Sequence, residues 1–141
     1  MIAENVQGKK APFFRLKVDA SDKPEVVLVK EGNFYFSVLE ERGGKTRMLD
    51  PLVDASKIFG TLLDYSFPKI FGENTPFKTP TNQIIENKIP CAFSLASLKL
   101  AAGQSKRMVS FFGQVNSVES LNRYVVRASR KGYVDAKHEE N

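Results

Sequence analysis

The stretch that decides the fold is Glu25-Val-Val-Leu-Val-Lys-Glu-Gly-Asn-Phe-Tyr-Phe-Ser-Val-Leu39. Residues 25–31 are apolar on both faces, which is typical of a central strand. Gly32-Asn33 predicts a tight turn of the kind that joins the two strands of a hairpin. Residues 34–39 then predict a second strand. The pattern therefore indicates an antiparallel sheet.

Further alternating runs lie on both sides of this stretch, and each is typical of a half-buried strand. They cover residues 12–18, 46–49, 91–100 and 107–115. Gly43-Gly44 predicts the turn before the second of these runs. The last two runs flank residues 101–104 and are expected to form a hairpin. Strands at this spacing, joined by glycine turns, predict a mostly β fold, an antiparallel β-sandwich.

The middle of the chain has a different character. Residues 54–63 predict a short helix, and three prolines then interrupt any regular element within residues 67–88. Long irregular loops in compact domains are often functional, so we expect this loop to contact carbohydrate or a neighbouring domain. The candidate contact residues on it are Phe67, Phe71, Asn74 and Phe77.

Residues 116–131 change to helical periodicity, which predicts a short amphipathic helix near the C-terminal end. Val118, Leu121, Val125 and Ala128 share its apolar face. Asn116 is the predicted N-cap, and Gly132 is the predicted stop. We therefore expect residues 1–132 to form the β-sandwich domain with its closing helix. Residues 133–141 are expected to begin a linker toward a helical domain.

Composition is that of one globular domain. The 141 residues are 42% apolar and 26% charged, which excludes an intrinsically disordered chain. No apolar run approaches the roughly 20 residues that span a bilayer, so no membrane partner is expected. The single cysteine, Cys91, excludes an internal disulfide and a cysteine-based metal cluster. We expect a cytoplasmic protein.

Catalytic constellations are scarce in the sequence. His138 is the only histidine, and it lies in a polar segment, where an exposed side chain is expected. Cys91 lies in an apolar strand, which favours an inert, buried thiol. Several pairs of carboxylates lie close together in the sequence, among them those at positions 50 and 54. None has a spacing that shows two carboxyl groups converging on one cleft, as acid/base catalysis requires. We expect no catalytic residue, no metal and no cofactor in this chain.

Basic residues are concentrated near the C-terminal end. Residues 99–131 contain seven basic side chains and one acid. The predicted basic surface consists of Lys106, Arg107, Arg123, Arg127 and Arg130. It could follow a phosphate backbone, dock on an acidic neighbouring domain or face solvent. Nucleic acid is disfavoured, because no recognised binding motif accompanies the charge.

The segment from Cys91 onward resembles the end of a known domain. Its signatures here are Leu100-Ala-Ala-Gly-Gln-Ser105, Phe111-Phe-Gly-Gln114, residues 117–122 and residues 133–140. They are similar to the strand, turn, strand, helix and linker that end the β-sandwich of the cellobiose phosphorylase and cyclic β-1,2-glucan synthase-like glycoside phosphorylases. Ala102 stands where the family usually has proline, and Gln104 where it usually has glutamate.

The resemblance implies a supersandwich-like, non-catalytic domain that buttresses a downstream helical-barrel catalytic domain. The parent enzyme would be a glycoside phosphorylase or glycosyltransferase acting on a β-glucan or disaccharide with inversion. The family's catalytic and phosphate-binding residues lie on the barrel, so none is carried over to this chain. The expected partners are that domain and a β-glucan oligosaccharide. Two alternatives stay open: a free-standing carbohydrate-binding module, and a basic interaction or nucleic-acid-binding domain.

Overall fold

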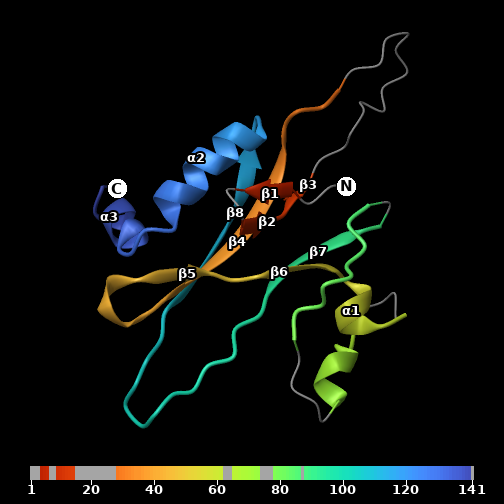
Figure 1. The fold of residues 1–141 in the computed structure, drawn as a ribbon, viewed down its shortest axis with the longest axis horizontal. Helices are drawn as coiled ribbons and strands as arrows, with labels where there is room; N and C mark the ends of the chain where they lie inside the picture. The colour runs from red at the N-terminus through yellow and green to blue at the C-terminus, as the bar shows by residue number, and fades with distance from the viewer. Residues whose placement is uncertain are drawn as a thin grey trace.

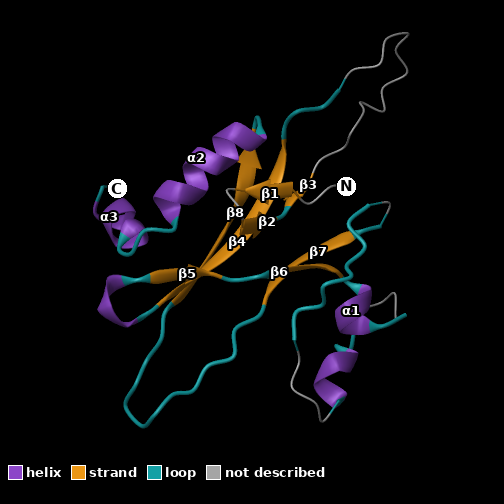
Figure 2. Ribbon diagram, in the orientation of Figure 1, coloured by secondary structure: helices purple, strands orange, loops and turns teal. Residues whose placement is uncertain are grey.

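The computed structural model describes residues 4–6, 9–14, 28–61, 65–73, 78–86 and 88–140, with backbone only before residue 11. Within these residues the chain forms three antiparallel sheets and several short helices (Figures 1 and 2). The antiparallel β class predicted from the sequence is confirmed. The described sheets are not closed, and they do not confirm the two stacked layers of a sandwich.

The largest sheet is built around one long strand, β4 (Gly32–Glu40). β8 (Met108–Val115) pairs with it antiparallel, from Gly32 opposite Val115 to Leu39 opposite Met108. Two short strands share the other edge of β4: β3 (Phe13–Phe14) near its start and β5 (Thr46–Met48) near its end. The sheet therefore joins segments from both ends of the chain.

The remaining elements surround this sheet. β1 (Glu4–Val6) pairs with β2 (Lys9–Ala11), and β6 (Pro51–Asp54) pairs with β7 (Pro90–Ser94). The α-helices are α1 (Ser56–Phe59), α2 (Val118–Ala128) and α3 (Tyr133–Glu139). Two 3₁₀ turns, η1 (Arg42–Gly44) and η2 (Lys69–Gly72), complete the set.

The core lies between the four-stranded sheet and α2. Alternate side chains of a strand face the same side, so Phe34, Phe36 and Val38 all point toward the helix. The apolar face of α2 covers them with Leu121, Val125 and Ala128, at the spacing predicted from the sequence. The ring of Phe36 stacks on that of Phe111 with centroids 4.8 Å apart, and Tyr124 lies over both.

Two predictions that rest on local sequence are confirmed, a glycine turn and an amphipathic helix. Gly43 and Gly44 have φ angles of 74° and 81° and connect β4 to β5, so the predicted turn is confirmed. The C-terminal amphipathic helix is confirmed as α2. Its N-cap is Ser117 rather than Asn116, because the Ser117 hydroxyl accepts a hydrogen bond from the Ser120 amide at 3.2 Å.

Two strand-pairing predictions are wrong. The predicted hairpin of residues 91–100 and 107–115 does not form, because β7 pairs with β6 and β8 pairs with β4. The predicted turn at Gly32-Asn33 is instead the start of β4, where Gly32 lies opposite Val115. Of the run at residues 25–31, only 28–31 are described, and they form a single bridge rather than a strand. The run at 15–18 and residues 62–64 lie outside the described residues.

Gly113 offers a test of the packing between sheet and helix. A Cβ at this position would lie 3.2 Å from two ring carbons of Phe34, and that ring is held between Phe36 and Tyr124. We expect Gly113→Ala to lower the free energy of unfolding by about 1–3 kcal/mol, because the crowded ring cannot move away. Urea unfolding measures the change. Gln114→Ala, at the exposed next position, is the control, and an equal loss there would contradict the explanation.

Candidate functional site

The predicted aromatic contact residues are exposed where the structure describes them. Phe67 is 56% exposed and Phe71, on η2, is 76% exposed. η2 lies next to α1 at the edge of the molecule (Figure 1). Asn74 and Phe77 lie outside the described residues. The rings of Phe67 and Phe71 are therefore both accessible to a partner.

A pocket of about 360 Å³ opens beside this region, and sequence reasoning did not find it. Its lining combines an aromatic ring, hydroxyl groups and one lysine. The residues are Asp54, Ala55, Ser56, Gly60, Thr61, Tyr65, Lys88 and Ile89. The Tyr65 ring packs edge-on against Phe59 at 5.1 Å, and its backbone has a φ of 53°, in the left-handed region that side chains rarely adopt.

Asp54 is a buried carboxylate beneath this pocket. It accepts hydrogen bonds from the Ser56 hydroxyl at 2.6 Å, the Ser56 amide at 3.1 Å and the Ile84 amide at 3.0 Å. The Lys88 ammonium lies 3.9 Å away. Burial alone would raise the pKa of Asp54, but these hydrogen bonds and Lys88 together hold it below its usual value. The charged carboxylate therefore joins β6 to residues 84–88.

Gln83 makes a second connection between the same two segments. Its side-chain oxygen accepts a hydrogen bond from the Val53 amide at 2.8 Å. Its side-chain nitrogen donates to the carbonyls of Pro51 at 3.1 Å and Pro80 at 3.2 Å. The amide therefore satisfies backbone groups that would otherwise lack partners, which fixes this part of the predicted irregular loop on β6.

Asp54 makes stability depend on pH in a defined window. The pKa of Asp54 is lowered, which means that the folded state favours the ionised carboxylate. The contribution of this carboxylate to the free energy of unfolding is therefore complete above the ordinary aspartate pKa of about 3.9. It is lost as the pH falls through the lower pKa of the folded state. We expect Asp54→Asn to cost about 1.5–3 kcal/mol near pH 7, with the difference from wild type shrinking below about pH 4. Urea unfolding across this pH range measures it. Asp50→Asn, an exposed neighbour, should change stability little, and a difference for Asp54→Asn that does not vary with pH would refute the account.

The surroundings of Cys91, which is half-buried, disfavour ionisation of its thiol. Burial, and then the charge of Asp54, raise its pKa to about 11. The thiol also lies 3.5 Å from the Leu52 carbonyl, to which it donates. The thiolate is the nucleophilic form, so the sequence-based expectation of an inert cysteine has a physical basis in this environment.

We expect alkylation of Cys91 by iodoacetamide at pH 8 to be about a hundredfold slower than that of a small free thiol. Mass spectrometry of the folded chain over time measures the rate. The urea-unfolded chain is the control and should react at the ordinary rate. Equal rates in the folded and unfolded chains would refute the assignment.

The predicted basic surface is divided between two places. Arg123, Arg127 and Arg130 are exposed on α2 and just after it. The Arg127 guanidinium lies over the rings of Tyr124 and Tyr133 at 5.8 and 6.0 Å from their centroids. Lys106 and Arg107 instead precede β8, and Arg107 donates a hydrogen bond to Asp135 of α3 at 2.8 Å.

Large apolar side chains are exposed on β8. Phe112 is 84% exposed and Met108 is 51% exposed. They lie on the face of the sheet opposite to α2, because their strand neighbours Phe111 and Val115 pack on the helix side. Sequence reasoning treated alternating phenylalanines as core, and only the structure shows that one face of this strand is uncovered.

Comparison with known proteins identifies no relative. No family model, no curated protein and no solved structure matches the chain. Among the described residues, no group of three or more histidine, cysteine or acidic side chains is placed to hold a metal ion. None of the helices in the described ranges is long and apolar enough to cross a membrane.

Proposed function

We propose that this chain is a non-catalytic β-sandwich domain of a carbohydrate-active enzyme that resembles the inverting β-glucan and disaccharide phosphorylases. In this proposal the β6–β7 pair and the four-stranded sheet are the two layers. The domain buttresses a helical catalytic domain of the same polypeptide and contacts it through the uncovered face of β8. We also propose a cytoplasmic location, since a single cysteine suits a reducing compartment.

The exposure of Phe112 is the observation that carries the proposal. A phenylalanine in the middle of an eight-residue strand is 84% exposed, although burying such a side chain is worth about 1.5–3 kcal/mol. Met108 is exposed on the same face. Single exposed apolar residues are ordinary, but two on the same face of one strand favour an interaction surface.

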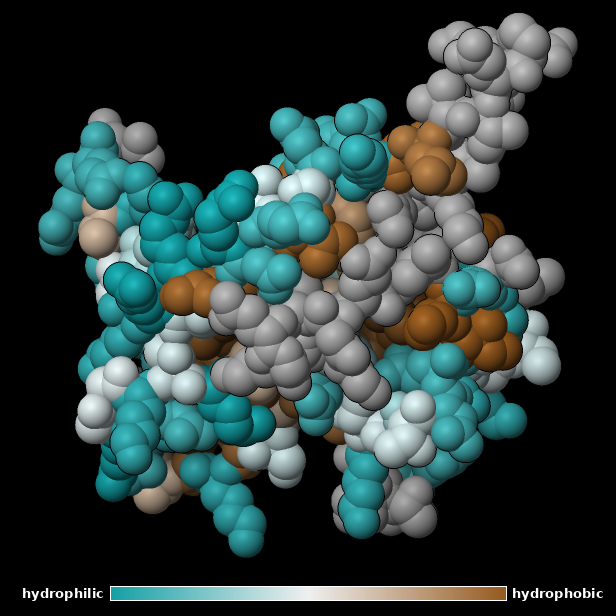
Figure 3. Space-filling view, turned by 45° about the horizontal axis from the view of Figure 1, so that its top comes forward, coloured by the Kyte–Doolittle hydropathy of each residue, from teal (hydrophilic) through white to brown (hydrophobic). Residues whose placement is uncertain are grey.

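The exposed apolar residues are concentrated in one part of the chain. Eight of the thirteen large hydrophobic side chains that are exposed in the described residues lie between positions 84 and 112. Figure 3 shows hydrophobic side chains reaching the surface in separate patches among hydrophilic ones. The family resemblance begins at Cys91 and includes β8 and α2. Five of these eight side chains, from Phe93 to Phe112, lie within the segment that resembles the phosphorylase domains.

The nucleic-acid alternative is less well supported. Two of the five predicted basic residues are held by contacts within the chain: Arg107 by Asp135, and Arg127 by two tyrosine rings. Arg123 also donates a hydrogen bond to the Ser120 hydroxyl at 3.1 Å. A surface that binds the phosphate backbone of a nucleic acid would instead present its cations unpaired along one groove.

The carbohydrate-binding alternative has one specific observation in its favour. The pocket beside Tyr65 offers an aromatic ring next to hydroxyl groups and Lys88. Amphipathic rings with nearby polar groups suit a pyranose, which has both apolar and hydroxyl-bearing surfaces. Calorimetric titration of a β-glucan oligosaccharide into this chain decides between the two roles, since only a free-standing module should bind it saturably without a catalytic domain.

The docking role predicts an effect of Phe112 on a larger polypeptide. We expect the reading frame that encodes this chain also to encode a helical catalytic domain, and the two to unfold as one unit. In that polypeptide, Phe112→Ser should lower the melting temperature by roughly 4 °C or more, because a buried ring is lost. Calorimetry measures it.

Leu28→Ser is the matched control, since Leu28 is 64% exposed but lies before β4 and outside the predicted contact residues. In the isolated 141-residue chain, Phe112→Ser should leave the melting temperature unchanged and should reduce the binding of a hydrophobic dye. The proposal fails if no helical domain is encoded, or if Phe112→Ser and Leu28→Ser lower the melting temperature of the larger polypeptide equally.

A further inference from the structure

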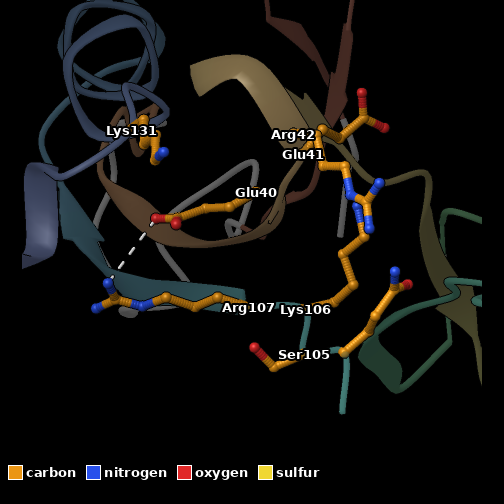
Figure 4. Close-up of a pocket in the computed structure, with 8 residues that line it drawn as sticks. Glu40, Glu41, Arg42, Ser105, Lys106, Arg107 and Lys131 are labelled. Carbon is orange, nitrogen blue, oxygen red and sulfur yellow. Dashed lines mark ion pairs between the residues drawn. The ribbon is translucent and has the colours of Figure 1, made fainter. Parts of the chain in front are cut away.

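Three segments that are distant in the sequence meet around one pocket of about 340 Å³ (Figure 4). The end of β4 and η1 contribute residues 40–42, the chain before β8 contributes residues 104–107, and the connection between α2 and α3 contributes Lys131. The Lys131 side chain lies against the η1 turn, with its Cδ 4.0 Å from the position that a Cβ on Gly44 would occupy. These residues are distant in the sequence and meet only in the folded chain.

The pocket has more positive than negative charge. Four cationic side chains and two carboxylates line it. The carboxylates already have partners: Glu41 accepts a hydrogen bond from Arg47 at 3.1 Å, and Glu40 lies 4.0 Å from Arg107. In the described part of the chain, no carboxylate lies within 4.0 Å of the charged groups of Arg42, Lys106 or Lys131. Three cations are therefore uncompensated around one opening.

Arg107 is held in position at the edge of this pocket. It lies 2.8 Å from Asp135 and 4.0 Å from Glu40. Its hydrogen bond to Asp135 raises the pKa of the guanidinium, and the same contact lowers the pKa of Asp135. A guanidinium has five N–H donors, so these two contacts leave donors for a third group. Arg107 can therefore bind an anion at little cost in side-chain entropy.

The opposite side of the pocket is built by the turn at η1. The positive φ angles of Gly43 and Gly44 make this turn tight, and the Glu41 amide donates to the Lys45 carbonyl at 2.8 Å. The side chains of Arg42 and Lys106 extend toward each other from the two walls (Figure 4). Two like charges that approach each other in this way repel, and an anion between them would relieve that repulsion.

We infer that this pocket binds a phosphate-type oxyanion, either inorganic phosphate or the phosphate group of a small molecule. A carboxylate brings one negative charge, whereas a phosphate ester carries about −1.5 to −2 and three acceptor oxygens, which matches three uncompensated cations better. The volume lies at the lower end of small-molecule sites, roughly 300–1,000 Å³. The hydroxyl of Ser105 and the amide of Gln104 add neutral hydrogen-bonding groups.

The test is titration of this chain with inorganic phosphate and, separately, with glycerol phosphate at constant ionic strength. We expect saturable binding that Lys106→Ala weakens about tenfold and Arg42→Ala weakens similarly, since each removes a charge-assisted hydrogen bond. Lys99→Ala is the matched control: it removes an exposed lysine that does not line the pocket and should leave affinity unchanged. Tighter binding of glycerol phosphate would identify a phosphorylated small molecule as the ligand, and tighter binding of phosphate would identify the free ion.

Three results would overturn the inference. One is the absence of saturable binding of either anion at millimolar concentration. Another is an equal loss of affinity in Lys99→Ala, which would show non-specific attraction. The third is single-stranded DNA binding that Arg123→Ala weakens more than Lys106→Ala, which would identify a nucleic-acid surface on α2. All of these measurements use the isolated chain, so they do not depend on the docking role of Phe112.

Discussion

The pairing of β4 with β8 is the interaction on which the rest of the structure depends. It joins residues as far apart in the sequence as Gly32 and Val115, and within it the hydroxyls of Ser37 and Ser110 lie 2.7 Å apart. Closing so long a loop costs conformational entropy, and that cost grows only slowly with length. The cost is offset on the helix side of the sheet, where the ring of Phe36 stacks on Phe111 and α2 covers both. The pairing thus adds Phe111 and Val115 of β8 to the apolar surface of β4 that α2 covers.

The chain between these two strands is held both by buried apolar side chains and by polar contacts. The buried apolar residues are Leu49, Leu52, Val53, Ala55 and Ile58. The described residues of the loop are fixed on β6 by one buried carboxylate, Asp54, and one amide, Gln83. Asp54 is buried and Gln83 half-buried, and polar groups removed from water in this way are stable only when they are hydrogen-bonded, as both are. Asp54 also affects Cys91, whose thiolate is disfavoured first by burial and then by the charge of Asp54. One carboxylate thus contributes to both the local fold and the ionisation of a neighbouring thiol.

The two faces of the β4–β8 pair have different roles in the proposed function. The face under α2 is closed by the chain itself. On the opposite face, Ser37 and Leu39 of β4 are buried, whereas Phe112 and Met108 of β8 are exposed. The charged pocket lies at the end of the same pair, where Glu40 and Arg107 meet. An apolar docking face and an anion pocket would therefore both be fixed by the same strand register, and a shift of one residue would exchange the two faces.

The sequence by itself determined the elements whose physics is local. Gly43-Gly44 specified a turn because glycine adopts positive φ at low cost, and the spacing from Val118 to Ala128 specified α2 because an apolar stripe must be covered. Only the tertiary structure decided which strands pair, since alternation marks a strand but carries no information about its distant partner. The tertiary structure also decided that Phe112 is exposed. It brought Arg42, Lys106 and Lys131 to one pocket, because side chains so far apart in the chain meet only after long-range contacts form.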